Sequence, residues 1–212
     1  MSSPFLGDLG RKFARLATDV AVRSPRLWRI FRPIVRKQFD SIAGEWDSIR
    51  SPGHLAPYES ALAAVDPLPR AALDLGTGTG QGAFALARRF PEAEIVGVDL
   101  AERMVAEAER KTPQDLRGRV RFEQGDASAL PYPDGSFQLV AHANMIPFFD
   151  ELARVLAPGS QTLFAFSAGA QTPIYVPTER LREELKRRGF TEFAEFDIGT
   201  GTALLARKAD RI

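Results

Sequence analysis

The chain has 212 residues, 44% hydrophobic and 26% charged, a composition typical of one globular domain with modest additions. The absence of cysteine excludes disulfides, zinc–thiolate and iron–sulfur sites and a cysteine nucleophile, and two histidines leave little for a metal centre, so no metal is expected. Because 28 basic residues balance 27 acidic ones, we expect no nucleic-acid partner. Residues 1–13 lack the apolar segment of a signal peptide, and the longest uncharged run, 155–178, is too polar to span a membrane. These features predict a cytoplasmic protein.

The N-terminal segment is strongly basic. Residues 11–37 contain nine basic residues and one acid, Asp19, and apolar side chains interleave with the basic ones from Leu27 to Lys37. This pattern predicts an amphipathic helix that Pro33 either opens or kinks. A solvated basic face is the default interpretation. Peripheral contact of residues 11–37 with an anionic membrane surface is the second, and nucleic-acid binding is the third.

From residue 71 onward, predicted strands and helices alternate. The expected strands are Ala71–Leu75, Ile95–Val98, Val120–Phe122, Phe137–Ala141, Thr162–Phe166, Phe193–Ile198 and Ala203–Ala206. The expected helices are Gln81–Phe90, Ala101–Lys111, about Phe148–Leu156 with its end at Pro158-Gly159, and one from Thr178 to Gly189. This order predicts the α/β class: a doubly wound, mostly parallel, seven-stranded Rossmann-like sheet with an N-terminal helical extension. Ligands of such sheets bind at the carboxyl ends of the strands.

The loop after the first predicted strand is rich in glycine. Gly76, Gly78 and Gly80 alternate with threonines, which lets the backbone turn sharply and approach a ligand closely before the next helix begins. After the second strand comes Asp99, where a carboxylate can accept both hydroxyls of a ribose. After the third comes Asp126, beside the same cleft. Together these residues predict a pocket for a nucleoside with a charged tail.

The same loop also satisfies the dinucleotide pattern G-x-G-x-x-A over residues 78–83, so a nicotinamide-dependent oxidoreductase is an alternative. A short-chain reductase of that kind would need a Tyr-x-x-x-Lys proton donor. The fourth residues after Tyr58, Tyr132 and Tyr175 are Leu62, Ser136 and Glu179. The pair is therefore absent, and the pattern by itself is a weak signal.

Four motifs in register resemble those of class I S-adenosylmethionine (SAM)-dependent methyltransferases. They are Asp74-Leu75-Gly76-Thr77-Gly78-Thr79-Gly80, Val96-Gly97-Val98-Asp99 followed by Met104, Gly125-Asp126-Ala127 through Phe137, and Arg154-Val155-Leu156-Ala157-Pro158-Gly159, with Ser160 where a second glycine is usual. The resemblance covers roughly 39–206. It is to small-molecule enzymes of the methyltransferase type 11 and quinone-biosynthesis C-methyltransferase group, and it divides the chain into a basic helical lid segment, 1–50, and a Rossmann-like methyltransferase domain, 51–212.

The resemblance implies SAM as the cofactor, S-adenosylhomocysteine as its product, and a role for each motif residue. Gly76, Gly78 and Gly80 would let the backbone pass the methionine moiety, with Asp74 near its ammonium group. Asp99 would accept the ribose hydroxyls, Asp126 the adenine amino group, and the Ala127 N–H would face the ring. Leu100 and Met104 would wall the adenine, although core packing explains Met104 equally well.

The acceptor side is harder to read, because displacement at a sulfonium needs a general base only when the acceptor must lose a proton. His142 could be that base or could serve only local hydrogen bonds, and Tyr175 could face the substrate. The run Asn144 to Phe148 lacks the Pro-Pro of amino-methylating motifs. Phe148, Phe149 and Tyr175 favour a small, partly apolar acceptor.

The run Phe39-Asp40-Ser41-Ile42-Ala43-Gly44-Glu45-Trp46-Asp47 resembles the signature that precedes the core in quinone and other small-molecule methyltransferases. By that resemblance Phe39 and Trp46 are lid aromatics over the cofactor. An ordinary helix packed at the sheet edge is the alternative. A non-catalytic SAM-binding protein is the competing function.

Overall fold

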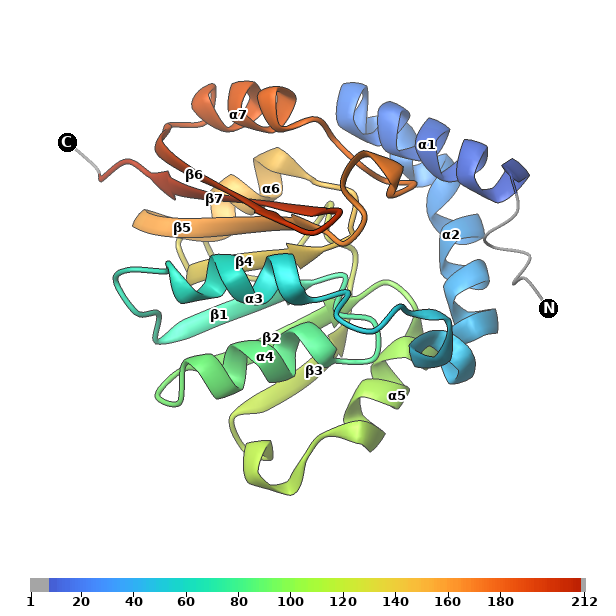
Figure 1. Ribbon diagram of the computed structural model, residues 1–212, viewed down its shortest axis with the longest axis horizontal. Helices are drawn as coiled ribbons and strands as arrows, with labels where there is room; N and C mark the ends of the chain where they lie inside the picture. The colour runs from blue at the N-terminus through green and yellow to red at the C-terminus, as the bar shows by residue number, and fades with distance from the viewer. Residues whose placement is uncertain (1–7, 211–212) are drawn as a thin grey trace.

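A computed structural model describes residues 8–210, in which seven strands form one sheet in the order β3-β2-β1-β4-β5-β7-β6 (Figure 1). The strands are β1 (Ala71–Leu75), β2 (Glu94–Asp99), β3 (Val120–Gln124), β4 (Phe137–Ala143), β5 (Leu156–Phe166), β6 (Phe190–Ile198) and β7 (Gly201–Lys208). Neighbours from β3 to β5 pair in parallel, and β7 runs antiparallel to both β5 and β6. The predicted doubly wound, seven-stranded sheet is confirmed.

Helices cover both faces of the sheet. The helices after the N-terminal extension are α3 (Ala56–Ala63), α4 (Gln81–Arg89), α5 (Glu102–Lys111), α6 (Phe149–Val155) and α7 (Thr178–Lys186). Side chains of α3, α4 and α5 share one apolar cluster with one face of the sheet, and those of α6 and α7 share another cluster with the opposite face. Figure 1 shows α3 and α4 in front of the strands and α6 behind them.

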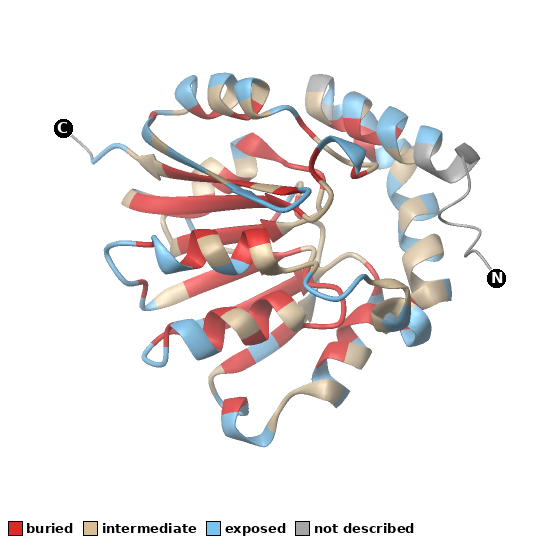
Figure 2. Ribbon diagram, viewed as in Figure 1, coloured by how far each residue is buried: buried red, intermediate tan, exposed pale blue. Residues whose placement is uncertain are grey.

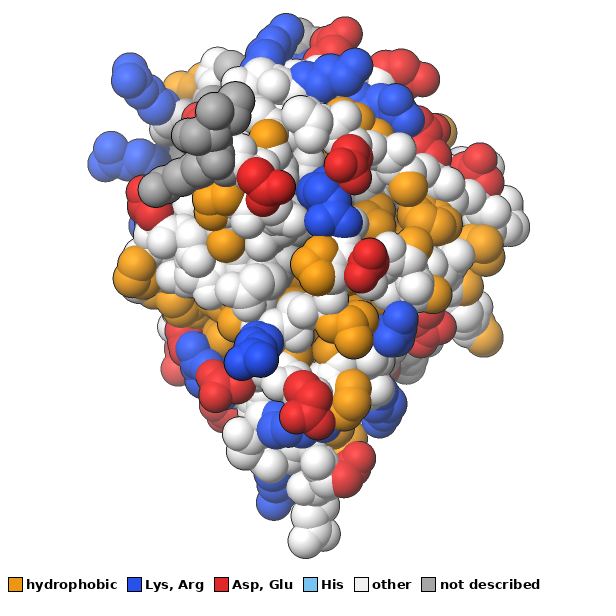
Figure 3. Space-filling model, turned by 90° about the vertical axis from the view of Figure 1, so that its left-hand side faces the viewer, with side chains coloured by type: hydrophobic (Ala, Val, Ile, Leu, Met, Phe, Trp, Pro, Cys, Tyr) orange, Lys and Arg blue, Asp and Glu red, His pale blue; other side chains and the backbone are white. Residues whose placement is uncertain are grey.

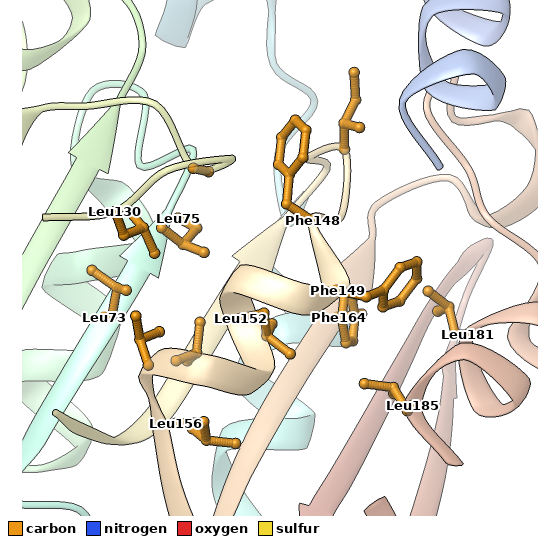
Figure 4. Packing of buried hydrophobic residues seen from close by; sticks show 14 of the residues in the cluster. Leu73, Leu75, Leu130, Phe148, Phe149, Leu152, Leu156, Phe164, Leu181 and Leu185 are labelled. Carbon is orange, nitrogen blue, oxygen red and sulfur yellow. The ribbon is translucent and has the colours of Figure 1, made fainter. Parts of the chain in front are cut away.

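The central strand β1 shows why both faces must be covered. Leu73 and Leu75 point into the cluster beneath α6, whereas Ala72 between them points toward α3 and α4, and all three are fully buried. Because successive side chains of a strand alternate between faces, a continuous apolar run is stable only with a helical layer on each side. Figure 4 shows the α6 side, where Leu152 lies over the sheet and Phe149 is directed toward Leu181 of α7.

The helix predicted over about Phe148–Leu156 is confirmed as α6, Phe149–Val155, but the predicted start of the next strand needs correction. Pro158-Gly159, expected to end the helix, belong to β5, which begins at Leu156 and not at Thr162. Gly159 has a φ of 71°, and its N–H donates to the Ala209 carbonyl, so a glycine and a proline fit this irregular start of a strand. Helix α3 was not predicted. It carries Tyr58 and Leu62 into the core, but its eight residues are too few to show a clear periodicity.

The N-terminal helices lie across the carboxyl ends of the parallel strands, on the right of Figure 1. They are α1 (Asp8–Arg23), the short 3₁₀ turn η2 (Pro25–Leu27), α2 (Trp28–Ile42) and the 3₁₀ helix η3 (Ala43–Ile49). Pro33 lies within α2, which continues past it. In the described part of the chain, no helix is both long and apolar enough to cross a bilayer.

The opposite edge of the molecule carries no concentration of one charge. Figure 3 shows this face, where basic and acidic side chains are interspersed with separate apolar ones. The strongly basic segment, in contrast, forms α1 and α2, at the edge where ligands of this fold bind.

Candidate functional site

The glycine loop joins β1 to α4 through backbone that only glycine adopts easily. Gly76, Gly78 and Gly80 have φ values of 68°, 54° and 88°. The N–H groups of Gly76 and Thr77 donate to the Val98 carbonyl at 2.8 and 3.0 Å, which fixes the loop to the end of β2. A Cβ at Gly76 would lie 2.7 Å from the Met145 Cγ, so the loop passes close under the wall of the cleft.

Asp99 ends β2 at the centre of this edge. Its Oδ2 accepts the Gly78 N–H at 2.8 Å and its Oδ1 accepts the Ala101 N–H at 2.9 Å. Burial raises the pKa of Asp99 to about 6, although these backbone N–H groups oppose the rise. The carboxylate therefore links the glycine loop to the start of α5 and keeps further accepting capacity toward the cleft that it lines.

Asp126, after β3, is held by helix α2 as well as by its own loop. The Trp28 Nε1–H donates to Oδ1 and the Arg32 guanidinium to Oδ2, both at 3.1 Å. Ser128 donates its backbone N–H and its hydroxyl to Oδ1. Burial by itself would raise the pKa of Asp126, but these hydrogen bonds outweigh it and hold the pKa below its usual value.

A cleft with a volume of about 120 Å³ separates the strand ends from the N-terminal helices. Most of its wall is apolar, and its residues are Trp28, Val35, Phe39, Trp46, Arg50, Gly76, Gly78, Val98, Asp99, Leu100, Met104, Gly125, Asp126, Ala127, Ala143, Asn144, Met145, Ile146, Phe148 and Ile174. Leu100, Met104 and Ala127 thus line the same cleft, although Met104 is also fully buried in a small cluster with Ala43 and Ala101.

Asp74 and Gly80 lie outside this main cleft. Asp74 is buried and accepts hydrogen bonds from the Tyr58 hydroxyl at 3.0 Å and the Thr77 hydroxyl at 2.6 Å. Burial raises its pKa to about 6. It lines a smaller adjoining pocket that shares Arg50 and Gly78 with the cleft. A Cβ at Gly80 would meet aromatic side chains of the core at 2.8 and 2.9 Å, so this glycine allows close packing.

Of the two residues predicted for the lid, Trp46 lies against the glycine loop and Phe39 packs on Trp46. Phe39 and Trp46 pack edge to face with ring centroids 5.4 Å apart, and both line the cleft. A Cβ at Gly78 would lie 3.1 Å from the Trp46 Nε1. The neighbouring Asp47 accepts a hydrogen bond from the Thr79 hydroxyl at 2.5 Å and pairs with the Lys111 ammonium at 2.9 Å. The segment η3 is thus fastened to both the loop and α5.

Arg50 is a site residue that the sequence did not single out. Its guanidinium lies 4.1 Å above the Trp46 ring and lines both the cleft and the adjoining pocket. Burial lowers the pKa of Arg50 to about 10 against the opposing charge of Asp47, and its Nε–H is buried without a hydrogen-bond partner. Nothing in the sequence distinguishes it from the other basic residues, except its place three residues after the Phe39–Asp47 run.

The two residues predicted for the acceptor side lie behind the cleft wall. His142 is buried and stacks on Phe164 at 4.6 Å, and burial lowers its pKa to about 3. Met145, which lines the cleft, lies next to His142, and the His142 Nδ1 is 3.4 Å from the Met145 Sδ. Tyr175 packs against Phe166, while its neighbour Ile174 lines the cleft. A base or substrate contact by either residue stays a prediction that this geometry does not favour.

One site therefore collects Gly76, Gly78, Asp99, Leu100, Met104, Asp126, Ala127, Phe39 and Trp46, and it leaves out Asp74, Gly80, His142 and Tyr175. Sequence reasoning missed Arg50, Trp28 and Met145, which come from segments without a recognisable motif. Between residues 8 and 210, no three potential ligands among His, Cys, Asp and Glu gather as a metal site would require.

Comparison with known proteins gives a consistent result. The family described as "Methyltransferase domain" matches residues 72–159. The chain is 46% identical over 106 residues to a demethylmenaquinone methyltransferase of Thermus thermophilus, covering 46% of this chain and 47% of that protein. It is 37% identical over 146 residues to a malonyl-[acyl-carrier protein] O-methyltransferase of Halorhodospira halophila, covering 64% and 48%. The chain thus spans about half the length of these curated relatives.

Solved structures agree at the level of the fold. A SAM-dependent methyltransferase from Aquifex aeolicus superposes with a TM-score of 0.65 at 17% identity, and the match covers 78% of this chain and 97% of that one. At this identity the likeness establishes the fold alone. It extends beyond residues 72–159 to most of the described chain.

Proposed function

Because the chain belongs to the class I SAM-dependent methyltransferases, we propose that it transfers a methyl group from SAM to a small, partly apolar acceptor by in-line displacement. The observation that carries this proposal is the cleft itself. Three charged side chains, Arg50, Asp99 and Asp126, stand at separate places around a wall that is otherwise mainly apolar. This spacing suits a ligand with three polar parts and an apolar space beside it.

The residues present fit SAM. Arg50 is half-buried, and its buried Nε–H lacks a partner, so its guanidinium could pair with the carboxylate of the methionine moiety. Asp99 offers a carboxylate for the ribose hydroxyls, and the Asp126 Oδ2, bonded to Arg32, retains accepting capacity for the adenine amino group. Gly78 keeps open a space that a Cβ would fill against Trp46. Leu100, Met104 and Ala127 would flank the adenine.

Bound SAM supplies a methyl group on a sulfonium, whose leaving group is already activated. The protein would then mainly orient the acceptor and exclude water. In the described wall of the cleft the ionisable side chains are Arg50, Asp99 and Asp126, all assigned here to the cofactor. A methyl acceptor that is nucleophilic without a protein base fits this wall best. A carboxylate or an ionised enol or phenol has that property.

An apolar body on the acceptor is supported by the aliphatic and aromatic wall beyond the glycine loop. Met145, Ile146, Phe148 and Ile174 line that part of the cleft. The names of the two relatives specify a quinone precursor and a malonyl thioester as acceptors. We propose that residues 1–50 act as the lid segment of a domain formed by 51–212, with Phe39 and Trp46 closing the cleft. Residues 11–37 would also contact a membrane surface.

Calorimetric titration with S-adenosylhomocysteine, run beside NAD and NADP, tests the cofactor assignment. We expect binding of S-adenosylhomocysteine alone, because the chain supplies a carboxylate partner in Arg50 and lacks the Tyr-x-x-x-Lys pair of a short-chain reductase. Binding of a nicotinamide nucleotide instead would overturn the proposal together with its site assignments.

Methyl transfer is tested by mass spectrometry of acceptor panels incubated with SAM. A product from fatty acids, acidic thioesters or quinols is the expected result. A non-catalytic SAM-binding protein is the competing candidate, and normal S-adenosylhomocysteine affinity with no product across such a panel would favour it.

A further inference from the structure

Helix α2 has two apolar faces, and only one is covered by the protein. Trp28, Val35 and Phe39 point into the cleft. Ile30 and Ile34 lie about 200–240° around the helix from Trp28, at the i, i+4 spacing that places them on one stripe, and they are 65% and 53% exposed. Leu27, just before the helix, extends the stripe and is 46% exposed. An amphipathic helix of a globular protein normally needs one such face.

This stripe is a concentration of exposed apolar surface. Among the described residues, the exposed large hydrophobic side chains are Leu16, Leu27, Ile30, Ile34, Leu68 and Ile198, and four of these six belong to α1, η2 and α2. Figure 2 shows pale blue, exposed turns along the outer side of these helices. Single exposed apolar residues need no explanation, but a set on one helix face marks an interaction surface.

Basic side chains border the stripe. Residues 26–37 contain five of the 28 basic residues and none of the 27 acidic ones, so the rest of the chain is net acidic. Arg32 is bound to Asp126, whereas Arg26, Arg29, Arg36 and Lys37 are exposed. Around the helix, Lys37 lies next to Ile30. Arg29 and Arg36 lie together on the flank between the stripe and the side of Trp28, where Arg36 also lines a pocket with Asp126.

From this combination we propose that the outer face of α2 docks on an anionic membrane surface, with Leu27, Ile30 and Ile34 entering the headgroup region and the basic side chains contacting lipid phosphates. An amphipathic helix with an apolar stripe and a basic border is what such a surface binds. A second copy of the chain fits less well, because pairing through this stripe would bring two sets of cations together. A nucleic acid would leave the apolar stripe unexplained.

Docking would bring the cleft to the bilayer. The inner face of α2 lines the cleft, one helix diameter from the proposed contact, so an apolar acceptor could enter from the lipid without crossing water. This consequence rests on the proposed function. The docking itself does not, and its test below measures no methyl transfer.

Co-sedimentation of the full chain with vesicles tests the docking. We expect binding to phosphatidylcholine vesicles that contain phosphatidylglycerol, much weaker binding to phosphatidylcholine alone, and loss of binding as salt is raised. Replacing Ile30→Gln with Ile34→Gln should weaken binding about tenfold or more, from the loss of apolar insertion. Replacing Arg26, Arg29, Arg36 and Lys37 by Gln should weaken it about 600-fold, since each of the four cations near an anionic surface contributes about fivefold.

Matched controls lie elsewhere on the surface. Leu68→Gln with Ile198→Gln removes exposed apolar side chains outside α1 and α2, and Arg70→Gln with Arg88→Gln and Arg117→Gln removes exposed charges. All variants should keep the S-adenosylhomocysteine affinity and circular dichroism of the unmodified chain, which shows that they fold. Unchanged vesicle binding in the controls supports the proposal.

Three outcomes would overturn it. One is failure of the unmodified chain to bind the anionic vesicles. Another is full binding by the Ile30/Ile34 variant with loss only in the charge variant, which would mean a general polyanion site. The third is a concentration-dependent dimer in analytical ultracentrifugation that the Ile30/Ile34 variant abolishes, which would make the stripe an interface between copies.

Discussion

The charged side chains of the cleft are held by quite different neighbours. Asp99 is bonded to backbone N–H groups of the glycine loop and α5, Asp126 to side chains of α2, and Arg50 to the face of Trp46. Only the first of these arrangements is local to the strand ends. The other two need the N-terminal helices in place, so ligand binding and the position of those helices must be coupled.

The raised pKa of Asp99 predicts a pH-dependent affinity. Because this pKa is about 6, the group is mostly a carboxylate at pH 7 and above and becomes increasingly protonated as the pH falls through 6. Ribose hydroxyls donate to the carboxylate, so S-adenosylhomocysteine affinity should be flat above about pH 7 and fall by up to about tenfold per unit below about pH 6. Titration calorimetry across this range measures it.

The variant Asp99→Asn serves as the control for that profile. It should bind about 10- to 100-fold more weakly at neutral pH, from the loss of hydrogen bonds to a charged acceptor, and should show a smaller pH slope. A residual slope would belong to Asp74, whose pKa is also about 6. An identical slope in the variant and the unmodified chain would remove Asp99 from the ligand contact.

Arg50 is predicted to act on the amino-acid end of the ligand only. Arg50→Gln should weaken S-adenosylhomocysteine about 10- to 100-fold, because a charge-assisted contact to the carboxylate is lost. The affinity for 5′-methylthioadenosine, which lacks that carboxylate, should change less than about twofold by the same reasoning. Equal losses for the two ligands in parallel titrations would show that Arg50 only supports the fold of the lid.

At the scale of elements, the N-terminal segment is fastened to the α/β sheet at three places. At the first place, Trp28 and Arg32 of α2 donate hydrogen bonds to Asp126. At the second, Asp40 near the end of α2 accepts the backbone N–H of Arg103 at 3.0 Å. At the third, Asp47 of η3 accepts hydrogen bonds from Thr79 and Lys111. Burial by itself would raise the pKa of Asp47, but the hydrogen bonds from Thr79 and Lys111 lower it, so the Asp47 carboxylate is charged at neutral pH.

Loss of the Asp47 bonds to Thr79 and Lys111 should speed dissociation of the ligand. In Asp47→Ala, η3 loses its bonds to the glycine loop and α5, and the dissociation rate of S-adenosylhomocysteine should rise about fivefold, as for a partly exposed charged pair worth about 1 kcal/mol. Stopped-flow fluorescence of the tryptophans follows this step. Glu45→Ala, an exposed position on the same segment, is the matched control and should leave the rate unchanged. Equal dissociation rates in the two variants would show that the Asp47 bonds do not hold η3 over the ligand.

At the scale of the whole molecule, the cleft is continuous with one of the two apolar clusters that cover the sheet. The cluster beneath α6 and α7 includes Val98, Ala127 and Phe148, which also line the cleft, whereas the cluster of α3, α4 and α5 contributes none of its described buried residues to it. The helix that closes the cleft is also the one with the exposed apolar stripe, so docking at a surface and access to the ligand site meet in α2.

The sequence by itself determined the sheet and the cofactor side of the site. Apolar runs such as Ile95–Val98 must be buried on both faces, and chain order then places Gly78, Asp99 and Asp126 at the same edge, so motif and geometry coincide. Even there, the start of β5 was predicted too late, at Thr162, because Pro158 and Gly159 look like a helix stop but lie near the start of the strand.

Only the tertiary structure decided which residues from outside the motifs complete the site. Arg50 reaches the cleft and Trp28 reaches Asp126, 98 residues away in the chain, because helices pack across the strand ends, and no local pattern encodes that packing. The same packing places His142 behind Met145 and Asp74 in the adjoining pocket. Strand positions follow from periodicity along the chain, whereas side chains that meet across a cleft depend on how separate elements pack.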